Sequence, residues 1–132
     1  MSLECLIGPE GNLLENNKNN VRRLRVINPI LSNKELSSIK EISIGHWRTK
    51  TIDLTYEKKD GLKGMLSRLD EVCLEAESAI EQDYSFIVLS DRGISDSRMF
   101  LSSLLSCSSV HHHLTKRQLR TKIGIVIETG EA

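Results

Sequence analysis

The feature of this sequence that most constrains its fold is an alternation of strand-like and helix-like segments between residues 51 and 127. Segment 51–56 (TIDLTY) alternates polar and apolar residues and is rich in β-branched side chains, which predicts a strand. The runs 86–89 (FIVL) and 123–127 (IGIVI) are short and apolar, which is typical of strands covered on both faces of a parallel sheet.

Two helices are predicted between these strands. Over 62–80, apolar residues recur every three or four positions with charged residues opposite, and Asp60 precedes them as the expected N-cap. A Ser-capped helix is predicted over roughly 103–116. Crossovers of this length join parallel strands right-handedly and place the helices against the sheet. The predicted fold class is therefore α/β with a parallel βαβαβ core.

The first part of the chain has a different character. Residues 8–12 (GPEGN) and the paired asparagines at 16–17 and 19–20 favour turns, so we expect an irregular N-terminal arm over 1–48. Ser32 and Glu35 form a capping-box pattern that predicts one short helix within it. Residues 49–132 form the predicted βαβαβ segment. Because another helix would be due after residue 128, we expect arm and segment to be one part of a larger barrel-like or open α/β domain.

Composition excludes several classes of protein. Eighteen Lys and Arg balance eighteen Asp and Glu, which does not match the basic surface of a nucleic-acid-binding protein. The longest apolar run is far shorter than the roughly 20 residues of a membrane-spanning helix, and the start does not resemble a secretory signal. Three widely spaced cysteines, Cys5, Cys73 and Cys107, predict reduced thiols. We expect a cytoplasmic protein without nucleic-acid or membrane partners.

The best-placed polar pair is Asp91 and Arg92, directly after a predicted buried strand. Ligands collect at this carboxyl edge in open α/β sheets and barrels, so a ligand or metal site is one interpretation. The other, which we prefer, is a loop ion pair or a contact to an adjoining domain, because no catalytic companions follow. A receiver-type phospho-acceptor aspartate would need further acids at the first strand's end and a later lysine.

A run of three histidines, His111, His112 and His113, lies on the second predicted helix. Consecutive helical residues are rotated by about 100°, so the three rings cannot all converge on one metal ion. We therefore favour a structural or domain-docking role for them. No phosphate-binding glycine motif, zinc-protease motif or nucleophile elbow occurs, and Cys73 falls on an apolar helix stripe. We predict no catalytic, cofactor-binding or metal-binding residue.

Several segments resemble the central domain of the glutamate synthase large subunit, in the order found in that family. They are 6–15 (LIGPEGNLLE), 29–31 (PIL), 51–55 (TIDLT), 89–92 (LSDR), 103–105 (SLL), 110–114 (VHHHL) and 119–124 (LRTKIG).

The resemblance implies an α/β fold and a place between two catalytic parts of one polypeptide. Glutamate synthases hydrolyse glutamine in an amidotransferase domain, pass ammonia through a tunnel, and reductively aminate 2-oxoglutarate on a barrel with FMN and an iron–sulfur cluster. The nucleophilic cysteine, the FMN and the cluster belong to those other domains, so none of them is expected here. Cys5 is not that nucleophile, and the resemblance does not distinguish ferredoxin from a nicotinamide electron donor.

Two functions remain open at this point. The first is a non-catalytic scaffold segment of glutamate synthase, which would also contribute to the wall of the ammonia tunnel. The second is an independent small-ligand or receiver-like module that uses Asp91 and Arg92.

Overall fold

The computed structural model describes residues 5–9, 24–44 and 47–130. Within these ranges the strands and helices follow one another as β1 (Cys5–Ile7), β2 (Leu24–Val26), α1 (Asn33–Lys40), β3 (Ser43–Ile44), β4 (Trp47–Asp53), β5 (Thr55–Glu57), α2 (Gly61–Glu81), β6 (Phe86–Ser90), β7 (Arg98–Phe100), α3 (Ser103–Lys116) and β8 (Gly124–Glu128). Short 3₁₀ turns at Lys58–Asp60 and Arg120–Lys122 precede α2 and β8.

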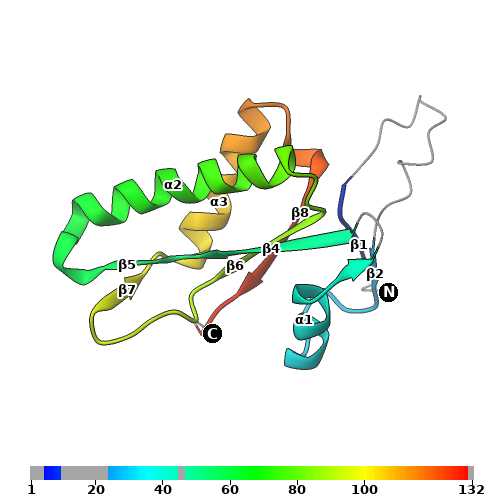
Figure 1. Ribbon diagram of the computed structural model, residues 1–132, viewed down its shortest axis with the longest axis horizontal. Helices are drawn as coiled ribbons and strands as arrows, with labels where there is room; N and C mark the ends of the chain where they lie inside the picture. Colours follow the sequence, from blue (N-terminus) through cyan, green and yellow to red (C-terminus); the bar gives the residue numbers. More distant parts are fainter. Residues whose placement is uncertain (1–4, 10–23, 45–46, 131–132) are drawn as a thin grey trace.

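The sheet has the order β3-β4-β6-β8 (Figure 1). β4, β6 and β8 run parallel, while the two-residue β3 pairs antiparallel with β4. Along the carboxyl edge of the sheet, Asp53 on β4 is the register partner of Ser90 on β6, and Ser90 is the partner of Glu128 on β8. The predicted α/β class and parallel βαβαβ order are therefore confirmed.

Helices α2 and α3 cover one face of the parallel strands (Figure 1). The core between these layers contains Ile52 from β4, Ile87 and Leu89 from β6, and apolar residues of both helices. From α2 and α3 it takes Val72, Cys73, Ala76, Ala79, Val110 and Leu114. The helical spacing of these side chains explains why the sequence pattern located α2 within one residue at each end.

The helix starts differ in how they are capped. Ser102 caps α3 as predicted, because its hydroxyl accepts a hydrogen bond from the Leu105 amide at 3.4 Å. The prediction for Asp60 is wrong with respect to its side chain, which makes no capping hydrogen bond. Asp60 ends a 3₁₀ turn and has a helical backbone, whereas a side-chain cap usually needs an extended one.

The predicted strand 51–56 is divided in the structure. β4 ends at Asp53, and β5 leaves the parallel sheet to pair antiparallel with β7. The break is held from both sides: the Leu54 amide donates to the Ser90 carbonyl, and the Leu54 carbonyl accepts from the Leu101 amide, each at 2.8 Å. These bonds come from distant parts of the chain, so local alternation could not reveal them.

The N-terminal arm contains more regular structure than the turn-rich sequence predicted. α1 begins with the predicted capping box, in which the Glu35 amide donates to the Ser32 hydroxyl and the Ser32 amide to the Glu35 carboxylate. The short strands β1 and β2 pair antiparallel and were not predicted. The predicted turns at 10–12 and 16–20 lie outside the described residues. The division of the chain at residue 48 stays a prediction.

The face of the sheet opposite α2 and α3 is covered by the N-terminal arm. Phe86 and Val88 are fully buried yet lie outside the core beneath α2 and α3, so their side chains face the other way. α1 is bonded to this side of β4, where the Thr49 hydroxyl donates to the Ile39 carbonyl at 2.6 Å. In the described part of the chain, no helix combines the length and apolar character of a membrane span.

A glycine in β8 allows the arm to approach the sheet. A Cβ added at Gly124 would lie 2.8 Å from the Gly8 nitrogen and 3.0 Å from a ring carbon of Phe86. We predict that Gly124→Ala lowers the free energy of unfolding by about 1–3 kcal/mol, because the clash involves backbone that must shift. Urea unfolding of the purified chain measures this difference.

Gly130→Ala is the matched control, since a Cβ there meets no atom within 4 Å. It should change the unfolding free energy by no more than about 0.5 kcal/mol. Equal effects of the two substitutions would contradict a close approach between Gly8 and Gly124.

Candidate functional site

The carboxyl edge of the parallel sheet carries an acid at each strand. Asp53 is the last residue of β4, Asp91 follows β6, and Glu128 is the last residue of β8. The sequence had singled out only Asp91. The missed signal was Glu128, which directly follows the predicted strand 123–127 as Asp91 follows the strand before it, because parallel strands bring these ends to one edge. Asp53 lies inside the predicted strand 51–56 and gave no such signal.

Asp91 is buried, with an exposed fraction of 6%, and its carboxylate is occupied by groups from the same chain. The Thr129 hydroxyl donates to Oδ2 at 2.7 Å, and the Gly130 amide donates to Oδ1 at 3.1 Å. The Asp91 amide donates in turn to the Glu128 carbonyl at 3.2 Å. Asp91 therefore ties the loop after β6 to the residues that follow β8.

Arg92 extends from the same loop in the direction of the arm. Its Nε lies 2.8 Å from Glu128 Oε1, and one terminal nitrogen donates to the side-chain oxygen of Asn33 at 3.4 Å. Asn33 is the first residue of α1. Arg92 is 61% exposed, so it screens the buried Glu128 from solvent while its outer face stays accessible.

Glu128 is buried and receives two cations. Lys40, the last residue of α1, forms a short ion pair with Oε2, opposite the contact of Arg92 with Oε1. Burial raises the pKa of Glu128, but hydrogen bonds from Lys40 and Ser90 and the charges of Lys40 and Arg92 outweigh it, so the net pKa lies below the usual value. We call Lys40, Ser90, Arg92 and Glu128 the Glu128 cluster.

The Glu128 cluster joins three parts of the fold. Glu128 belongs to β8, Ser90 and Arg92 to the end of β6 and its loop, and Lys40 to the arm helix α1. Because Lys40 and Glu128 are 88 positions apart in sequence, no local pattern could pair them. Arg92 contacts Glu128 and Asn33, so its ion pair joins the loop after β6 to β8. A contact of Asp91 or Arg92 with an adjoining domain stays a prediction.

Asp53, at the third strand end, organises the departure of β5. Its Oδ1 accepts from the Thr55 amide at 2.9 Å and from the Thr55 hydroxyl at 2.8 Å. Arg98 of β7 donates to the same hydroxyl at 2.8 Å and to the Thr55 carbonyl at 3.0 Å. The loop after β6 lies close by, because a Cβ at Gly93 would be 3.1 Å from Asp53 Oδ1.

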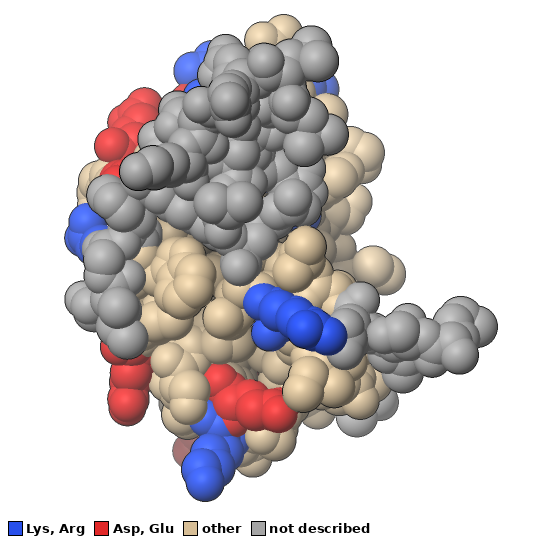
Figure 2. All heavy atoms as spheres, turned by 90° about the vertical axis from the view of Figure 1, so that its right-hand side faces the viewer, with Lys and Arg blue, Asp and Glu red and all other residues tan. Residues whose placement is uncertain are grey.

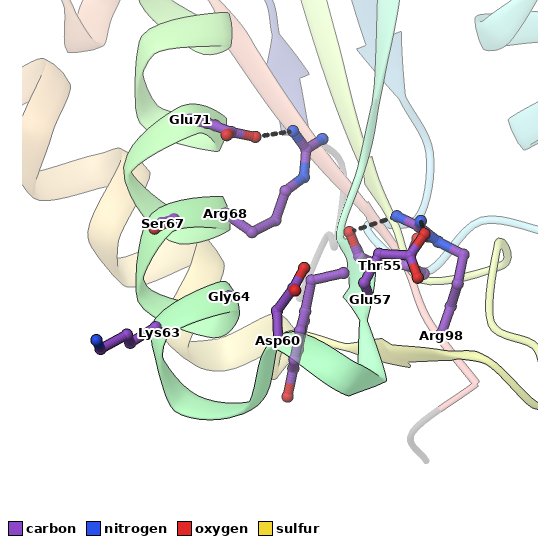
Figure 3. A pocket seen from close by; sticks show the side chains of 10 residues that line it. Thr55, Glu57, Asp60, Lys63, Gly64, Ser67, Arg68, Glu71 and Arg98 are labelled. Atoms are coloured by element: carbon purple, nitrogen blue, oxygen red, sulfur yellow. Dashed lines mark hydrogen bonds and ion pairs between the residues drawn. The ribbon is translucent and has the colours of Figure 1, made fainter.

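A polar groove of about 500 Å³ lies between α2, β5 and β7 (Figure 3). The charged residues along it are Glu57, Asp60, Lys63, Arg68, Glu71 and Arg98.

The guanidinium groups in this groove are already bonded within the chain. Arg68 Nε donates to the Asp53 carbonyl at 3.1 Å, and Arg68 also pairs with Glu71 at 3.0 Å and Glu75 at 3.2 Å. Burial lowers the pKa of Arg68, but the hydrogen bonds and charges of the two glutamates raise it by more, so the net pKa lies above the usual value. The guanidinium group therefore stays charged. Figure 3 shows Arg68 and Arg98 reaching acids on opposite sides of the groove.

The three histidines have separate neighbours. His113 Nε2 lies 2.8 Å from Glu77 Oε2, and His111 Nδ1 accepts from Arg120 at 3.0 Å. His112 meets the edge of the His111 ring with a centroid separation of 5.5 Å. The rings of His111 and His113 therefore contact different partners.

His113 belongs to a link between the two helices that cover the sheet. Glu77 on α2 binds both His113 and Arg117, with Arg117 at 2.8 Å. These two hydrogen bonds lower the pKa of Glu77. The geometry gives His113 a structural contact within the chain, while His112 remains exposed on α3.

The cysteines are unpaired thiols in this fold. Cys73 is buried in the core, as its position on the apolar stripe predicted, and burial together with the charge of Asp70 raises the pKa of its thiol. A raised pKa lowers the thiolate fraction and hence the reactivity of the sulfur. Cys107 packs against the same core, and Cys5 lies half-buried in β1.

The carboxyl edge is arranged for connection between segments. Each of its acids accepts hydrogen bonds from other elements, and the residues that the structure describes contain no group of at least three His, Cys, Asp or Glu positioned to share a metal ion. A general base needs a lone pair directed at substrate. Both carboxylate oxygens of Asp91 and Glu128, and Oδ1 of Asp53, instead contact groups of the same chain, namely Thr129, Gly130, Lys40, Arg92 and Thr55.

We predict that Glu128→Gln lowers the free energy of unfolding at neutral pH by about 1–3 kcal/mol, because hydrogen bonds to charged partners are lost while the site stays buried. Glu81→Gln, the same chemical change at an exposed position on α2, should cost no more than about 0.5 kcal/mol. Urea unfolding of both variants gives the comparison.

The effect should depend on pH in one direction. The pKa of Glu128 is lowered in the folded chain, so its stabilisation is present above the unfolded value of about 4.3 and disappears as pH falls through the folded value. Wild type and Glu128→Gln should therefore converge in acid. A difference that is independent of pH would show that the ion pairs do not contribute.

The whole chain matches the model of one known protein family. Residues 1–132 match the model described as the glutamate synthase central domain.

Individual relatives give the same result. The chain is 40% identical to the NADH-type glutamate synthase of Schizosaccharomyces pombe over 100% of its length. It is 35% identical to the large chain of the NADPH-type enzyme of Bacillus subtilis over 96%, and 32% identical to the ferredoxin-dependent enzyme of Antithamnion sp. over 99%. It spans only 6% of the first of these proteins and 8% of the other two.

Proposed function

Because this chain belongs to the glutamate synthase central-domain family, we propose that it is a non-catalytic structural segment of a larger glutamate synthase polypeptide. In this proposal it connects the glutaminase domain to the FMN-containing synthase domain, and it contributes to the wall of the path along which ammonia travels. The parent enzyme would convert glutamine and 2-oxoglutarate into two molecules of glutamate in the cytoplasm, with FMN and an iron–sulfur cluster held by its other domains.

The observation that carries the proposal is the match of the full chain to a central domain, combined with a carboxyl edge that binds its own chain. At the position where α/β enzymes usually hold ligands, Asp91 accepts from Thr129 and Gly130, and Glu128 accepts from Lys40 and Arg92. Such contacts stabilise a spacer because they fix how the arm and the sheet lie relative to each other.

The range of relatives supports the same role. Proteins named for NADH, NADPH and ferredoxin all match this segment over 96% of its length or more. A segment shared by enzymes with different electron donors is expected to serve a step that they have in common. Connecting the ammonia-producing and ammonia-consuming domains is such a step.

The test is made in the full-length enzyme with Glu128→Gln, which loosens the contact between α1 and β8. Glutamine hydrolysis and ammonia-dependent glutamate formation should each stay within about twofold of wild type, since the reacting groups lie elsewhere. Glutamine-dependent glutamate formation should fall by about tenfold, because it also requires the two domains to be correctly placed. Glu81→Gln serves as the matched control.

Asp91→Asn distinguishes a structural from a catalytic role. It keeps the size of the side chain and can still accept a hydrogen bond from Gly130, so both partial reactions should persist. Loss of either partial reaction in a folded Asp91→Asn enzyme would contradict the proposal.

One observation favours a second candidate function, a small-ligand or receiver-like module. Arg92 remains 61% exposed at the carboxyl edge and could meet an anion there. A thermal-shift screen of the chain with phosphates, divalent metals and small acids tests this candidate. We expect no stabilisation by any of them. Stabilisation that disappears in Asp91→Asn would favour the module, because a ligand specific for the folded state raises the melting temperature.

A further inference from the structure

β8 is the outer strand of the parallel sheet in the part of the chain that the structure describes. Its amide and carbonyl groups alternate between the neighbour β6 and the open side. The Gly124 amide donates to the Ser85 carbonyl at 2.9 Å, and the Glu128 carbonyl accepts from the Asp91 amide. Gly124, Val126 and Glu128 therefore direct their amides and carbonyls toward β6. The amides and carbonyls of Ile125 and Ile127 therefore face the open side.

This edge lacks the usual features that prevent another strand from pairing. Natural edge strands are often protected by Lys, Pro, a bulge or very short length. β8 is five residues long and reads GIVIE, and its one charge, Glu128, is turned inward to Lys40 and Arg92. At the other side of the sheet, β3 has only two residues. The open edge of β8 is thus the one suited to pairing.

An apolar groove lies beside the same edge. It has a volume of about 500 Å³ and is formed by β8 together with the described parts of the arm. Its apolar lining includes Ile7, Val26, Ile30 and Leu36 from the arm and Ile125, Val126 and Ile127 from β8. Of these three β8 residues, Val126 is the register partner of Val88 and shares its arm-side face of the sheet. Figure 2 views the molecule from the side of the arm and shows uncharged side chains over much of the described surface there. Ile30 and Ile127 are exposed to 82% and 41%.

We propose that an extended segment of the parent glutamate synthase polypeptide pairs with β8 at Ile125 and Ile127 and places alternate apolar side chains in this groove. Backbone hydrogen bonds to Ile125 and Ile127 would supply the affinity, and the groove would select apolar residues at every second position. The chain spans only 6% to 8% of the length of its relatives, so most of the polypeptide lies outside it.

The shape of the groove favours this occupant over a second copy of the chain. In a symmetric dimer the same surface of both copies meets, so each β8 would bring its own arm against the arm of the other. A single extended segment has no such obstacle, because it fits between β8 and the wall formed by β1, β2 and α1. An added segment would also lie beside the Ile127 side chain, which is 41% exposed, and reduce its contact with water.

Hydrogen exchange in the full-length enzyme, resolved to single amides, tests the inference. The amides of Ile125 and Ile127 should exchange about a hundredfold or more slowly than unstructured amides, at rates close to that of Val126, which faces β6. Rapid exchange at Ile125 and Ile127, with Val126 protected, would overturn the proposal. Protection that is lost when the enzyme is diluted to a monomer would also overturn it, in favour of a second copy.

A pair of variants of the full-length enzyme provides an independent measurement. Ile127→Lys should lower the thermal midpoint of unfolding clearly, because the paired segment would lie beside this side chain and cover the added charge. Leu104→Lys places the same charge on α3, where the side chain is 81% exposed, and should leave the midpoint nearly unchanged. Equal midpoints for both variants would contradict a covered β8 edge. The inference rests on family membership and the sheet edge, so its failure would leave the connecting role untouched.

Discussion

The fold depends on burial of the central strand β6, whose five residues are all buried. Ile87 and Leu89 pack beneath α2 and α3, while Phe86 and Val88 face the side of the arm. A strand buried on both faces requires a neighbour on each edge and a layer on each side, since its backbone and side chains lose contact with water. β4, β8, the helices and the arm all meet this requirement.

This constraint explains why so much of the fold could be predicted. A run such as FIVL has few alternatives to a buried parallel strand, and the helical spacing of Val72, Cys73 and Ala76 specifies the face that α2 turns to it. Bonds between distant segments could not be predicted. Leu54 is held by Ser90 and Leu101, which ends β4 early and creates the unforeseen pair of β5 and β7.

The candidate site shows the same division. The position of Asp91 and Arg92 at the carboxyl edge followed from strand order, but their partners did not. Lys40 approaches Glu128 only because the arm lies across the sheet, and no sequence pattern links residues in such different segments. Asp91 and Glu128 follow predicted strands in the sequence, whereas Asp53 becomes a strand end only through the break after β4. That each of these acids binds a neighbouring segment of the same chain required the three-dimensional arrangement.

A carboxyl edge that binds its own chain supports the proposed connecting role, because residues of the arm occupy the edge where other α/β proteins hold substrates. The most direct test is to purify the 132-residue chain, verify its helices and strands by circular dichroism, and assay glutamine hydrolysis and FMN binding. A non-catalytic segment should fold and show neither property. A folded chain that hydrolyses glutamine or acquires a flavin spectrum would contradict it.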